Sequence, residues 1–557
     1  HFFRFARIQL SHYNRMVHPW IRTNPVAIIL AILTNVALFT WLASHHPVHG
    51  QPALGATLQQ LDRQHTCTIL DFGDVACRES DNVLSDDILP FQIDVSKAEE
   101  DPKLAKMPGF DFMAYRRADI DSMYREAPGS RIEKKPAFNG QAGKFVNMSP
   151  ERLDLYWENV DGPMGHYISH TGPFESTGTS TFPGHVFHFI RPKTEEIVCS
   201  FRMHKGMAVY YCDPFVAYDA SDPSAGKYNE PLRSKSDLDE KQLELYEAAQ
   251  LNREFAPIYK NFTGGSEWLG NYPTEPPKHH MWRADYFGQE HFVQTRETQF
   301  LTLPPKEVLH RLSSAKLRRN WTDSPAMMQY RVPGLMNITI KVVSVEPRIF
   351  QIDGFLSDVE VDHILELALE KNLQRSTTGL PGSQSTISNV RTSRTTWLPR
   401  TSSPIMDAIF RRGADVLRIP EAMFRTRGAE EMNSYTTDKE PINEDLQIVH
   451  YDQGQQYTAH HDFGYPDSRP NAPSRSINLC MYLNDEGLVG GETAFPRARN
   501  AISDEGIKGV PQKGKAMIFY MRTPDGNLDD LSQHAANPVI EGEKWFANLW
   551  IWDPLRD

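Results

Sequence analysis

The sequence lacks a block of basic residues, internal repeats and low-complexity tracts. Its 59 lysine and arginine residues are outnumbered by 71 aspartate and glutamate residues, which gives a formal net charge of -12 at pH 7. Because no cluster of positive charge offsets this balance, general binding to nucleic acid is not expected. At 557 residues the chain is also too long for a single hydrophobic core, so two or three folded units are predicted.

Cysteine is scarce, with five residues in the whole chain. Cys67 and Cys77 are close in the sequence. The same is true of Cys199 and Cys212, and each pair could close a small loop in an oxidising compartment. Cys480 lies within an apolar strand pattern, which predicts a buried free thiol. The alternative is that all five cysteines are reduced and lie in folded cores.

One apolar run stands out in an otherwise soluble-like chain, over residues 24–44. It carries no formal charge and has about the length that a helix rising ~1.5 Å per residue needs to cross a bilayer. Arginines precede it, so a cytoplasmic tail over residues 1–23, a signal anchor over 24–44 and a lumenal remainder are predicted. We therefore expect a single-pass type II protein of the endoplasmic reticulum or Golgi membrane. A cleaved signal peptide is the alternative.

The rest of the chain changes character several times. Residues 45–145 are polar and rich in proline, glycine and aspartate, which is typical of a stem. Residues 146–214 contain short apolar-polar alternations broken by glycines, and these predict a small antiparallel β-sandwich. Residues 215–345 are predicted to be a linker and helical connecting region, with a charged amphipathic helix over 241–255.

The C-terminal unit, residues 346–557, has the clearest pattern. Ser357 and Glu360 have the spacing of a helix capping box, and Ser403-Pro404 predicts the start of a second helix. Strands are predicted at 447–451, 476–483, 515–521 and 545–552. Helices followed by a run of strands predict a mainly β fold with flanking helices, a double-stranded β-helix or jelly roll.

A metal-binding pattern lies between the first two of these strands. His460 and Asp462 are two residues apart, so on an extended chain both side chains leave the same face, while His461 points the other way. A third ligand farther along the chain would complete a set of two histidines and one carboxylate. That set leaves open positions on ferrous iron for a bidentate co-substrate and for oxygen. Taken alone, such a triplet is more often a surface loop.

A histidine and a lysine near the C-terminus strengthen this interpretation. His534 is followed ten residues later by Lys544, at the start of an apolar strand. An unpaired lysine is costly to bury, whereas an anionic ligand such as the distal carboxylate of 2-oxoglutarate would pair with it. The alternative is a snorkelling lysine and a loop histidine.

Together with several further motifs, these residues resemble the prolyl 4-hydroxylase catalytic domain. The motifs are Pro347-Arg-Ile-Phe, Gly354-Phe-Leu-Ser, Val390-Arg-Thr-Ser, Met481-Tyr-Leu-Asn, Gly490-Gly-Glu-Thr-Ala-Phe-Pro and Gly542-Glu-Lys-Trp. The resemblance implies iron ligands His460, Asp462 and His534, 2-oxoglutarate contacts from Lys544, Tyr451 and Thr493, and substrate-side residues Tyr457, Arg475 and Trp550.

The resemblance also implies a reaction. Fe(II) and 2-oxoglutarate would serve as cofactor and co-substrate, with ascorbate as the iron reductant, and a proline-containing protein would be hydroxylated to 4-hydroxyproline. A disulfide isomerase subunit or a homo-oligomer partner stays open. Trp552 stands where many relatives carry a histidine, and the loop 485–489 is longer than usual. Both departures leave another target side chain as the alternative.

The predicted β-sandwich carries a second resemblance, to the von Hippel–Lindau β domain. It rests on Leu155-Tyr-Trp-Glu-Asn-Val-Asp-Gly, on Tyr167 and on Thr181-Phe-Pro-Gly-His-Val-Phe. The resemblance implies a hydroxyproline pocket formed by Trp157, Tyr167, Thr181, His185 and Phe187. Aromatic walls with a few polar groups suit a hydroxylated pyrrolidine ring. Two alternatives are that these aromatics are only core residues, and that the chain is a hydroxyproline-binding scaffold with a vestigial oxygenase domain.

Overall fold

The computed structural model describes the strands at 65–69, 75–79, 91–92 and 116–117, and then residues 140–158, 165–271, 277, 279–284, 287–295, 297–312, 325–377, 390–428, 440–465, 473–498 and 506–553. All of these residues belong to one compact unit, residues 64–557. The predicted tail, the predicted anchor at 24–44 and most of the predicted stem lie outside the described residues. Within the described part of the chain, no helix is both long enough and apolar enough to cross a membrane.

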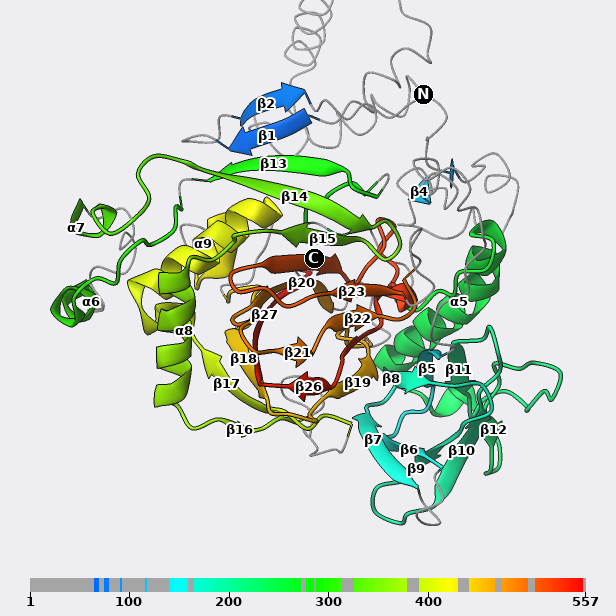
Figure 1. Cartoon of the computed structure of the whole chain (residues 1–557). Helices are drawn as coiled ribbons and strands as arrows, with labels where there is room; N and C mark the ends of the chain where they lie inside the picture. The colour runs from blue at the N-terminus through cyan, green and yellow to red at the C-terminus, as the bar shows by residue number, and fades with distance from the viewer. Residues whose placement is uncertain are drawn as a thin grey trace, which may run out of the picture. The chain divides into compact units, whose positions relative to one another are not determined.

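A nine-stranded antiparallel sheet forms the larger layer of the C-terminal part (Figure 1). In order across the sheet, its strands are β13 (Glu290–Thr295), β14 (Met336–Ser344), β15 (Ile349–Ile352), β24 (Ala516–Tyr520), β20 (Arg475–Tyr482), β27 (Lys544–Trp552), β18 (Leu446–Tyr451), β17 (Arg394–Leu398) and β16 (Gln374–Arg375). The four predicted C-terminal strands are confirmed to within one residue at each end. The sheet also recruits β13 and β14 from residues 215–345, where the sequence predicts a linker, because these strands pair in succession with β15.

A smaller sheet carries two of the predicted metal ligands. Its strands, in order, are β19 (Tyr457–His460), β25 (His534–Ala536), β22 (Thr493–Phe495) and β23 (Ile507–Gly509), and β21 (Val489–Gly490) pairs with β26 (Val539–Glu541) beside it. The large and small sheets give the mainly β, jelly-roll architecture that the sequence predicts. Because β19 and β25 are paired, two segments far apart in the sequence meet at the site.

Two helices brace the large sheet, as predicted. Helix α8 (Asp358–Glu370) begins at Ser357 with the capping box to Glu360, and α9 (Pro404–Leu417) begins at Ser403 with proline in its first turn. Both bury their apolar faces in the core of the large sheet. The Arg412 guanidinium on α9 pairs with the Glu360 carboxylate at 2.7 Å, and both side chains are fully buried. Two shorter helices, α6 (Lys306–Leu312) and α7 (Pro325–Met328), pack against the same core through Val308, Leu309 and Met327.

Residues 140–228, called the β-module below, form a separate sandwich of two sheets. One sheet has the order β12 (Lys227–Tyr228), β10 (Ile197–Arg202), β9 (Val186–Ile190), β6 (Leu153–Trp157) and β7 (His166–Thr171), and the other has the order β11 (Val209–Cys212), β5 (Gln141–Asn147) and β8 (Ser176–Thr181). Aromatic side chains from both sheets fill its core, with Phe145 packed on Phe187 at a ring separation of 4.7 Å. The predicted small β-sandwich is therefore present, with strands extending to Tyr228.

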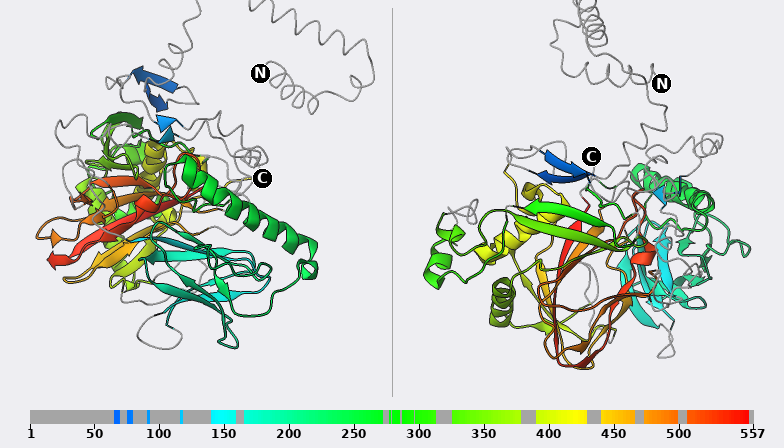
Figure 2. Two further views of the ribbon diagram at one scale, coloured as in Figure 1. Left: turned by 90° about the vertical axis from the view of Figure 1, so that its right-hand side faces the viewer. Right: turned by 45° about the horizontal axis from the view of Figure 1, so that its top comes forward.

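The β-module is packed directly onto the oxygenase-like sheets. Helix α5 (Glu240–Phe262) follows the module and runs alongside it (Figure 2). A single buried cluster contains Val146 of the module, Tyr246 of α5 and Phe495 and Phe519 of the two C-terminal sheets. The segment after the module therefore does not act as a free tether, because helix and module share a core with the C-terminal sheets.

The cysteines differ in part from expectation. Cys199 on β10 and Cys212 on β11 are free, buried thiols, so the loop-closing pair suggested by their spacing is not formed here and the alternative of reduced core cysteines holds for them. Cys480 is a buried free thiol, as predicted. Cys67 and Cys77 are register partners on the paired strands β1 (His65–Ile69) and β2 (Val75–Glu79). Strands β3 (Phe91–Gln92) and β4 (Arg116–Arg117) also pair.

Candidate active site

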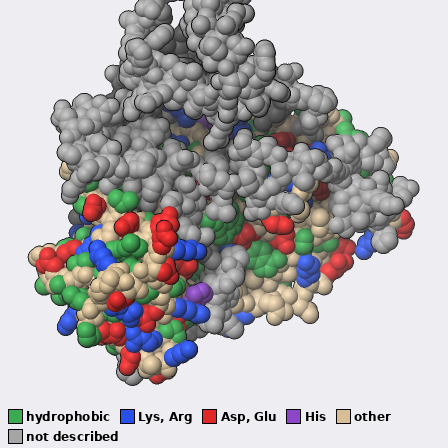
Figure 3. Space-filling view, turned by 180° about the vertical axis from the view of Figure 1, so that it is seen from behind, with side chains coloured by type: hydrophobic (Ala, Val, Ile, Leu, Met, Phe, Trp, Pro, Cys, Tyr) green, Lys and Arg blue, Asp and Glu red, His purple; other side chains and the backbone are tan. Residues whose placement is uncertain are grey.

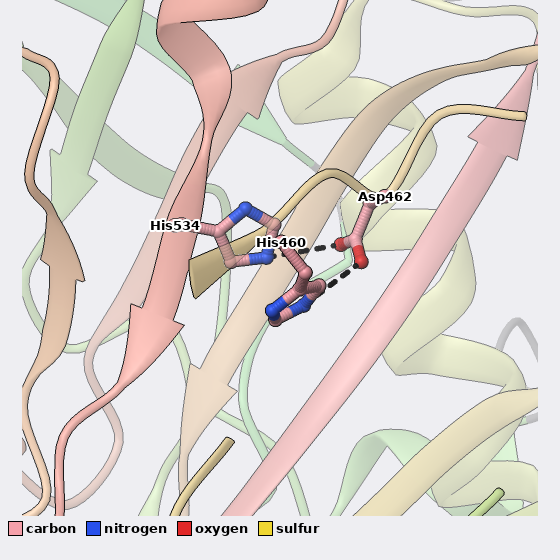
Figure 4. Close-up of side chains that lie close together, drawn as sticks. All are labelled: His460, Asp462 and His534. Atoms are coloured by element: carbon pink, nitrogen blue, oxygen red, sulfur yellow. Dashed lines mark ion pairs between the residues drawn. The ribbon is translucent and has the colours of Figure 1, made fainter. Parts of the chain in front are cut away.

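The small sheet brings the three predicted metal ligands together. His460 ends β19 and is the register partner of His534 on β25, while Asp462 lies two residues beyond β19. The Nε2 atoms of His460 and His534 lie 3.4 and 3.3 Å from the two carboxylate oxygens of Asp462. All three side chains converge on one point (Figure 4), with their candidate ligand atoms within 4.8 Å of one another. The placement of His460 and Asp462 on one side of the chain agrees with the strand-face argument, whereas His534 is expected only from the resemblance.

Hydrogen bonds outside the triad fix how these side chains are oriented. Nδ1 of His460 donates to the carbonyl of Thr458 at 2.8 Å, and Nδ1 of His534 donates to the carbonyl of Ser532 at 3.0 Å. With Nδ1 used in this way, each Nε2 presents a lone pair toward the centre of the site. This is the arrangement that metal-ligating histidines require.

Asp462 is oriented by two side-chain donors of its own. The Trp550 indole N–H donates to a carboxylate oxygen at 2.8 Å, and the amide nitrogen of Asn478 donates to the same oxygen at 3.1 Å. The first lies on β27 and the second on β20, adjacent strands of the large sheet. The carboxylate is therefore held by the large sheet while the histidines come from the small one.

Burial and neighbouring groups set the protonation states that suit a metal ligand set. Burial, together with the nearby His534, lowers the pKa of His460 to about 4, so its imidazole is neutral at physiological pH. Burial alone would raise the pKa of Asp462, but the adjacent rings of His534 and His460 hold it well below its usual value. Two histidines with one ionised carboxylate match the facial triad of non-haem Fe(II) oxygenases.

His450, Asp452 and Glu543 form a second group of possible metal ligands, but an arginine already contacts this group. Arg394 contacts His450 Nδ1 at 3.2 Å and Asp452 at 2.9 Å. Its guanidinium already supplies the positive charge that a cation would bring, and Glu543 is exposed while Asp452 is half-buried. The triad therefore remains the better metal site.

Lys544 provides a binding site for an anion in the same cavity. Its side chain is almost fully buried, its ammonium nitrogen has no hydrogen-bond partner among the described residues, and burial lowers its pKa to about 8. The rings around it belong to Phe546, Tyr451 and Tyr482, with the nitrogen 4.5 to 5.8 Å from their centroids. The hydroxyl of Thr493 is also buried without a partner. A buried ammonium without a partner among the described residues fits the distal carboxylate of 2-oxoglutarate, and Thr493 lines the same cavity.

The residues predicted on the substrate side have firm contacts of their own. The Tyr457 ring stacks on His460 at a centroid distance of 3.5 Å, and burial raises the pKa of Tyr457 to about 12. Arg475 pairs with Glu444 at 2.6 Å and lies 3.9 Å from the Trp550 ring centroid. Because the Trp550 N–H donates to Asp462, its first role in this structure is to position the metal carboxylate.

Sequence reasoning missed Asn478 and Arg391. Asn478 is a polar residue at an alternate position of the apolar strand β20, and that break in the apolar pattern was the signal available for it. Arg391 belongs to the quoted Val390-Arg-Thr-Ser motif, and its guanidinium lies 4.9 Å from the Tyr457 ring centroid. Its side chain also donates to the side-chain oxygen of Gln447. No local pattern indicates which long-range partners these two side chains contact.

Four of the five residues predicted for the β-module pocket line one wall of this cavity, namely Trp157, Tyr167, His185 and Phe187. The Trp157 and His185 rings pack at 4.9 Å, and burial lowers the pKa of His185. Thr181 is not among the lining residues. Its buried hydroxyl contacts Nδ1 of His185 at 3.1 Å, so it supports the histidine from outside the cavity. Phe187 also packs into the module core.

One cavity of about 1000 Å³ contains both sets of residues. It is lined by the metal triad, by the anion site around Lys544 and by strands β7 and β8 of the module. This volume lies at the upper end of what small-molecule sites occupy, so the cavity has room for a co-substrate and part of a larger substrate.

Comparisons with known proteins agree with this geometry. Residues 446–552 match the family described as the 2OG-Fe(II) oxygenase superfamily. Prolyl 4-hydroxylase 2 of Arabidopsis thaliana is 34% identical over 228 residues, which are 38% of this chain and 69% of that protein. Prolyl 4-hydroxylase 5 of the same plant is 31% identical over 225 residues, covering 38% and 70%.

A viral collagen prolyl hydroxylase from Paramecium Bursaria Chlorella virus-1, in its 2OG complex, shares 28% sequence identity over 37% of this chain and 95% of that chain, with a TM-score of 0.26. The curated relatives and this structure each cover well under half of the present chain.

Proposed function

Because the chain belongs to the prolyl 4-hydroxylase family, we propose that it converts peptidyl proline to 4-hydroxyproline with O2 and 2-oxoglutarate. The main observation in support of this proposal is that one cavity is lined by both a two-histidine, one-carboxylate triad and a buried ammonium without a partner among the described residues. A metal needs the first and a dicarboxylate co-substrate needs the second.

Each residue has a task in this proposal. His460, Asp462 and His534 would hold iron, which supplies the oxidising chemistry when it is bound. Lys544 and Thr493 would pair with the distal carboxylate of 2-oxoglutarate and so orient its other end. Tyr457, stacked on His460 and neutral, forms an apolar side of the site toward the substrate.

From the sequence alone, we also propose a reductant for the iron and a membrane anchor. Ascorbate would keep the iron reduced, and a membrane anchor over residues 24–44 would hold the C-terminal part in the lumen of the endoplasmic reticulum or Golgi. A disulfide isomerase or homo-oligomer partner stays open.

The test uses the purified full chain with Fe(II), ascorbate and labelled 2-oxoglutarate. Carbon dioxide release is followed with and without proline-containing peptides, beside a His460→Ala variant. We expect peptide-dependent release that the variant loses, together with a mass gain of one oxygen atom on proline. An oxygen gained on a different side chain would replace the proposed substrate with the alternative target. An absence of turnover with every peptide, despite bound iron, would contradict the proposal and favour a binding role.

A second candidate function is hydroxyproline binding by the β-module. It is supported by the packing of Trp157 on His185 and by the Tyr167 hydroxyl, which is buried without a partner in the same cavity. We propose that this pocket accepts a hydroxylated pyrrolidine ring. Matched peptides with proline or hydroxyproline would be bound to the full chain without 2-oxoglutarate. Tighter binding of the hydroxylated peptide, lost in Trp157→Ala, is expected. Equal binding of both peptides would rule the function out.

A further inference from the structure

The β-module and the C-terminal sheets form opposite parts of a single cavity. From the module come the edge strands β7 and β8 together with Trp157, Phe182 and His185, and from the sheets come the metal triad and Lys544. The module therefore contributes directly to the space in which the chemistry takes place. It is not a separate binding unit at a distance.

Polar contacts hold the module in a fixed place beside the metal site. Ser180 of β8 contacts Nδ1 of His461 at 3.0 Å, and this histidine lies between two of the triad residues in sequence. The backbone N–H of Ala142 on β5 donates at 2.8 Å to Asp530, whose backbone carbonyl contacts His461 Nε2 at 3.0 Å. These bonds and the shared apolar core connect the module to the chain segment that carries the triad.

A glycine allows this close approach. A side-chain carbon at Gly178 of β8 would collide with the ring of Tyr465, a residue that follows β19 in the sequence. It would also collide with the backbone oxygen of Gly143. The module and the C-terminal sheets are therefore in contact at β8. This contact fixes the distance between the two walls of the cavity.

The module side of the cavity has a distinct chemistry. No aspartate, glutamate, lysine or arginine of the module is among the described residues that line it, whereas serine, threonine, histidine and aromatic side chains are. The outer surface of the module is different, with exposed charges such as Lys193, Glu195 and Arg202. Figure 3 shows acidic and basic side chains interspersed over the described residues at its lower left. The wall therefore suits an uncharged occupant.

Two features of this wall point to an extended polypeptide. The strands β7 and β8 are each at the edge of their sheet, so no other strand of the described residues uses their outer backbone groups. The Tyr167 hydroxyl and His170 Nδ1 on β7 are buried and have no hydrogen-bond partner in the part of the chain that the structure describes. An extended proline-rich chain makes no internal hydrogen bonds, so its carbonyls are available to such groups, and its rings pack well on aromatic side chains.

We propose that the β-module forms one wall of the peptide-binding cleft. An uncharged, extended, proline-rich segment lies across it, with the target proline at the metal triad and a second ring of the same polypeptide on Trp157 and His185. This inference rests on the proposed function and adds to it a second contact region on the same substrate chain.

The test compares two uncharged peptides, a short one with a single proline and a long proline-rich one with the same target. Turnover of both is measured with the wild-type full chain, with Trp157→Ala and with Tyr167→Phe, which removes only a hydroxyl. Tyr218→Ala is the matched control, because Tyr218 is a 48% exposed aromatic of the module that does not line the cavity. Binding of the long peptide is measured in parallel.

For Trp157→Ala we expect kcat/KM to fall about tenfold with the long peptide, which corresponds to about 1.4 kcal/mol. The loss with the short peptide should be clearly smaller, because it lacks the second ring, and Tyr167→Phe should show a smaller loss than Trp157→Ala with the long peptide. Equal kcat/KM of variant and wild type with both peptides, or an equal loss with both, would overturn the inference. If the wild type turns over neither peptide, the proposed function fails. Binding of the long peptide that depends on Trp157 would then still support the cleft, and binding that does not would remove it.

Discussion

The two ligand regions of the cavity differ in how their polar groups are satisfied. At the metal site the ligands are oriented by other protein groups, yet Lys544 and Thr493 keep buried polar atoms that no protein group satisfies. In the module, the buried hydroxyl of Thr181 is already used by His185, and the Tyr167 hydroxyl, which has no hydrogen-bond partner among the described residues, is a neutral group. The metal site therefore differs in burying a charged group without a partner, which costs more to leave unpaired than a hydroxyl does.

This difference separates two kinds of inference. The anion site is inferred from a missing partner, because a buried ammonium is costly to leave unpaired. The module pocket is inferred from its position in a shared cavity, from a neutral Tyr167 hydroxyl without a partner among the described residues, and from aromatic packing around Trp157, which the module core would also favour. Variants that each remove a single contact, either at the anion and metal site or in the module pocket, show whether the two regions depend on each other.

The largest effect is expected for Lys544→Met, which removes the unpaired charge. The KM for 2-oxoglutarate should rise about a hundredfold or more, since truncating one partner of a buried charge pair costs about 3–5 kcal/mol. Without 2-oxoglutarate, the melting temperature should rise, because the variant no longer buries a charge without a partner. Kinetics and thermal unfolding measure the two results. A lower melting temperature in the absence of 2-oxoglutarate would contradict the anion-site interpretation.

Trp550→Phe should have the next largest effect, because it removes the indole N–H that orients Asp462 but keeps an aromatic ring. Iron affinity should fall about tenfold to a hundredfold, as is typical for partners of metal ligands. The matched control is Trp552→Phe, since the Trp552 N–H donates to Glu444 and not to Asp462. Iron titration of both variants measures the difference. Equal affinities in the two would show that the Trp550 contact does not orient the ligand.

Short-range features of the fold and site could be predicted from the sequence. The capping box at Ser357 and the start of the helix after Ser403 depend on residues within one turn. The alternation that places His460 and Asp462 on one side depends only on strand geometry. These local rules gave correct positions without knowledge of the rest of the chain.

Features that depend on distant segments could not be predicted in this way. The pairing of β13 and β14 with β15, and the docking of the module through Phe495 and Phe519, depend on which apolar faces meet in the folded protein. The contact between Trp550 and Asp462 joins residues far apart in the chain. The resemblance placed Thr181 in the pocket itself, whereas its rotamer directs the hydroxyl to His185.

The pH dependence of 2-oxoglutarate binding should distinguish the anion site from the module pocket. Because burial lowers the pKa of Lys544 to about 8, its ammonium is charged below that pH and must take up a proton on binding above it. The affinity for 2-oxoglutarate should therefore fall by up to about tenfold per pH unit above about 8. The unfolded lysine keeps its proton to a higher pH, so stability without ligand should rise between about 8 and the ordinary lysine pKa. Calorimetry and thermal unfolding across this range check both signs, and a Lys544→Arg variant should show neither trend.

The smallest effect is expected at Thr181, where the module pocket is supported from outside the cavity. Thr181→Val keeps the shape of the side chain but removes the hydroxyl that contacts His185 Nδ1. Hydroxyproline-peptide binding should weaken about threefold, because a net hydrogen bond contributes about 0.5–1.5 kcal/mol and the histidine can find water instead. Thr181→Ser should bind as the wild type does, and the KM for 2-oxoglutarate should be unchanged in both. A large change in that KM would show that the module and the metal site are coupled more tightly than their separate contacts indicate.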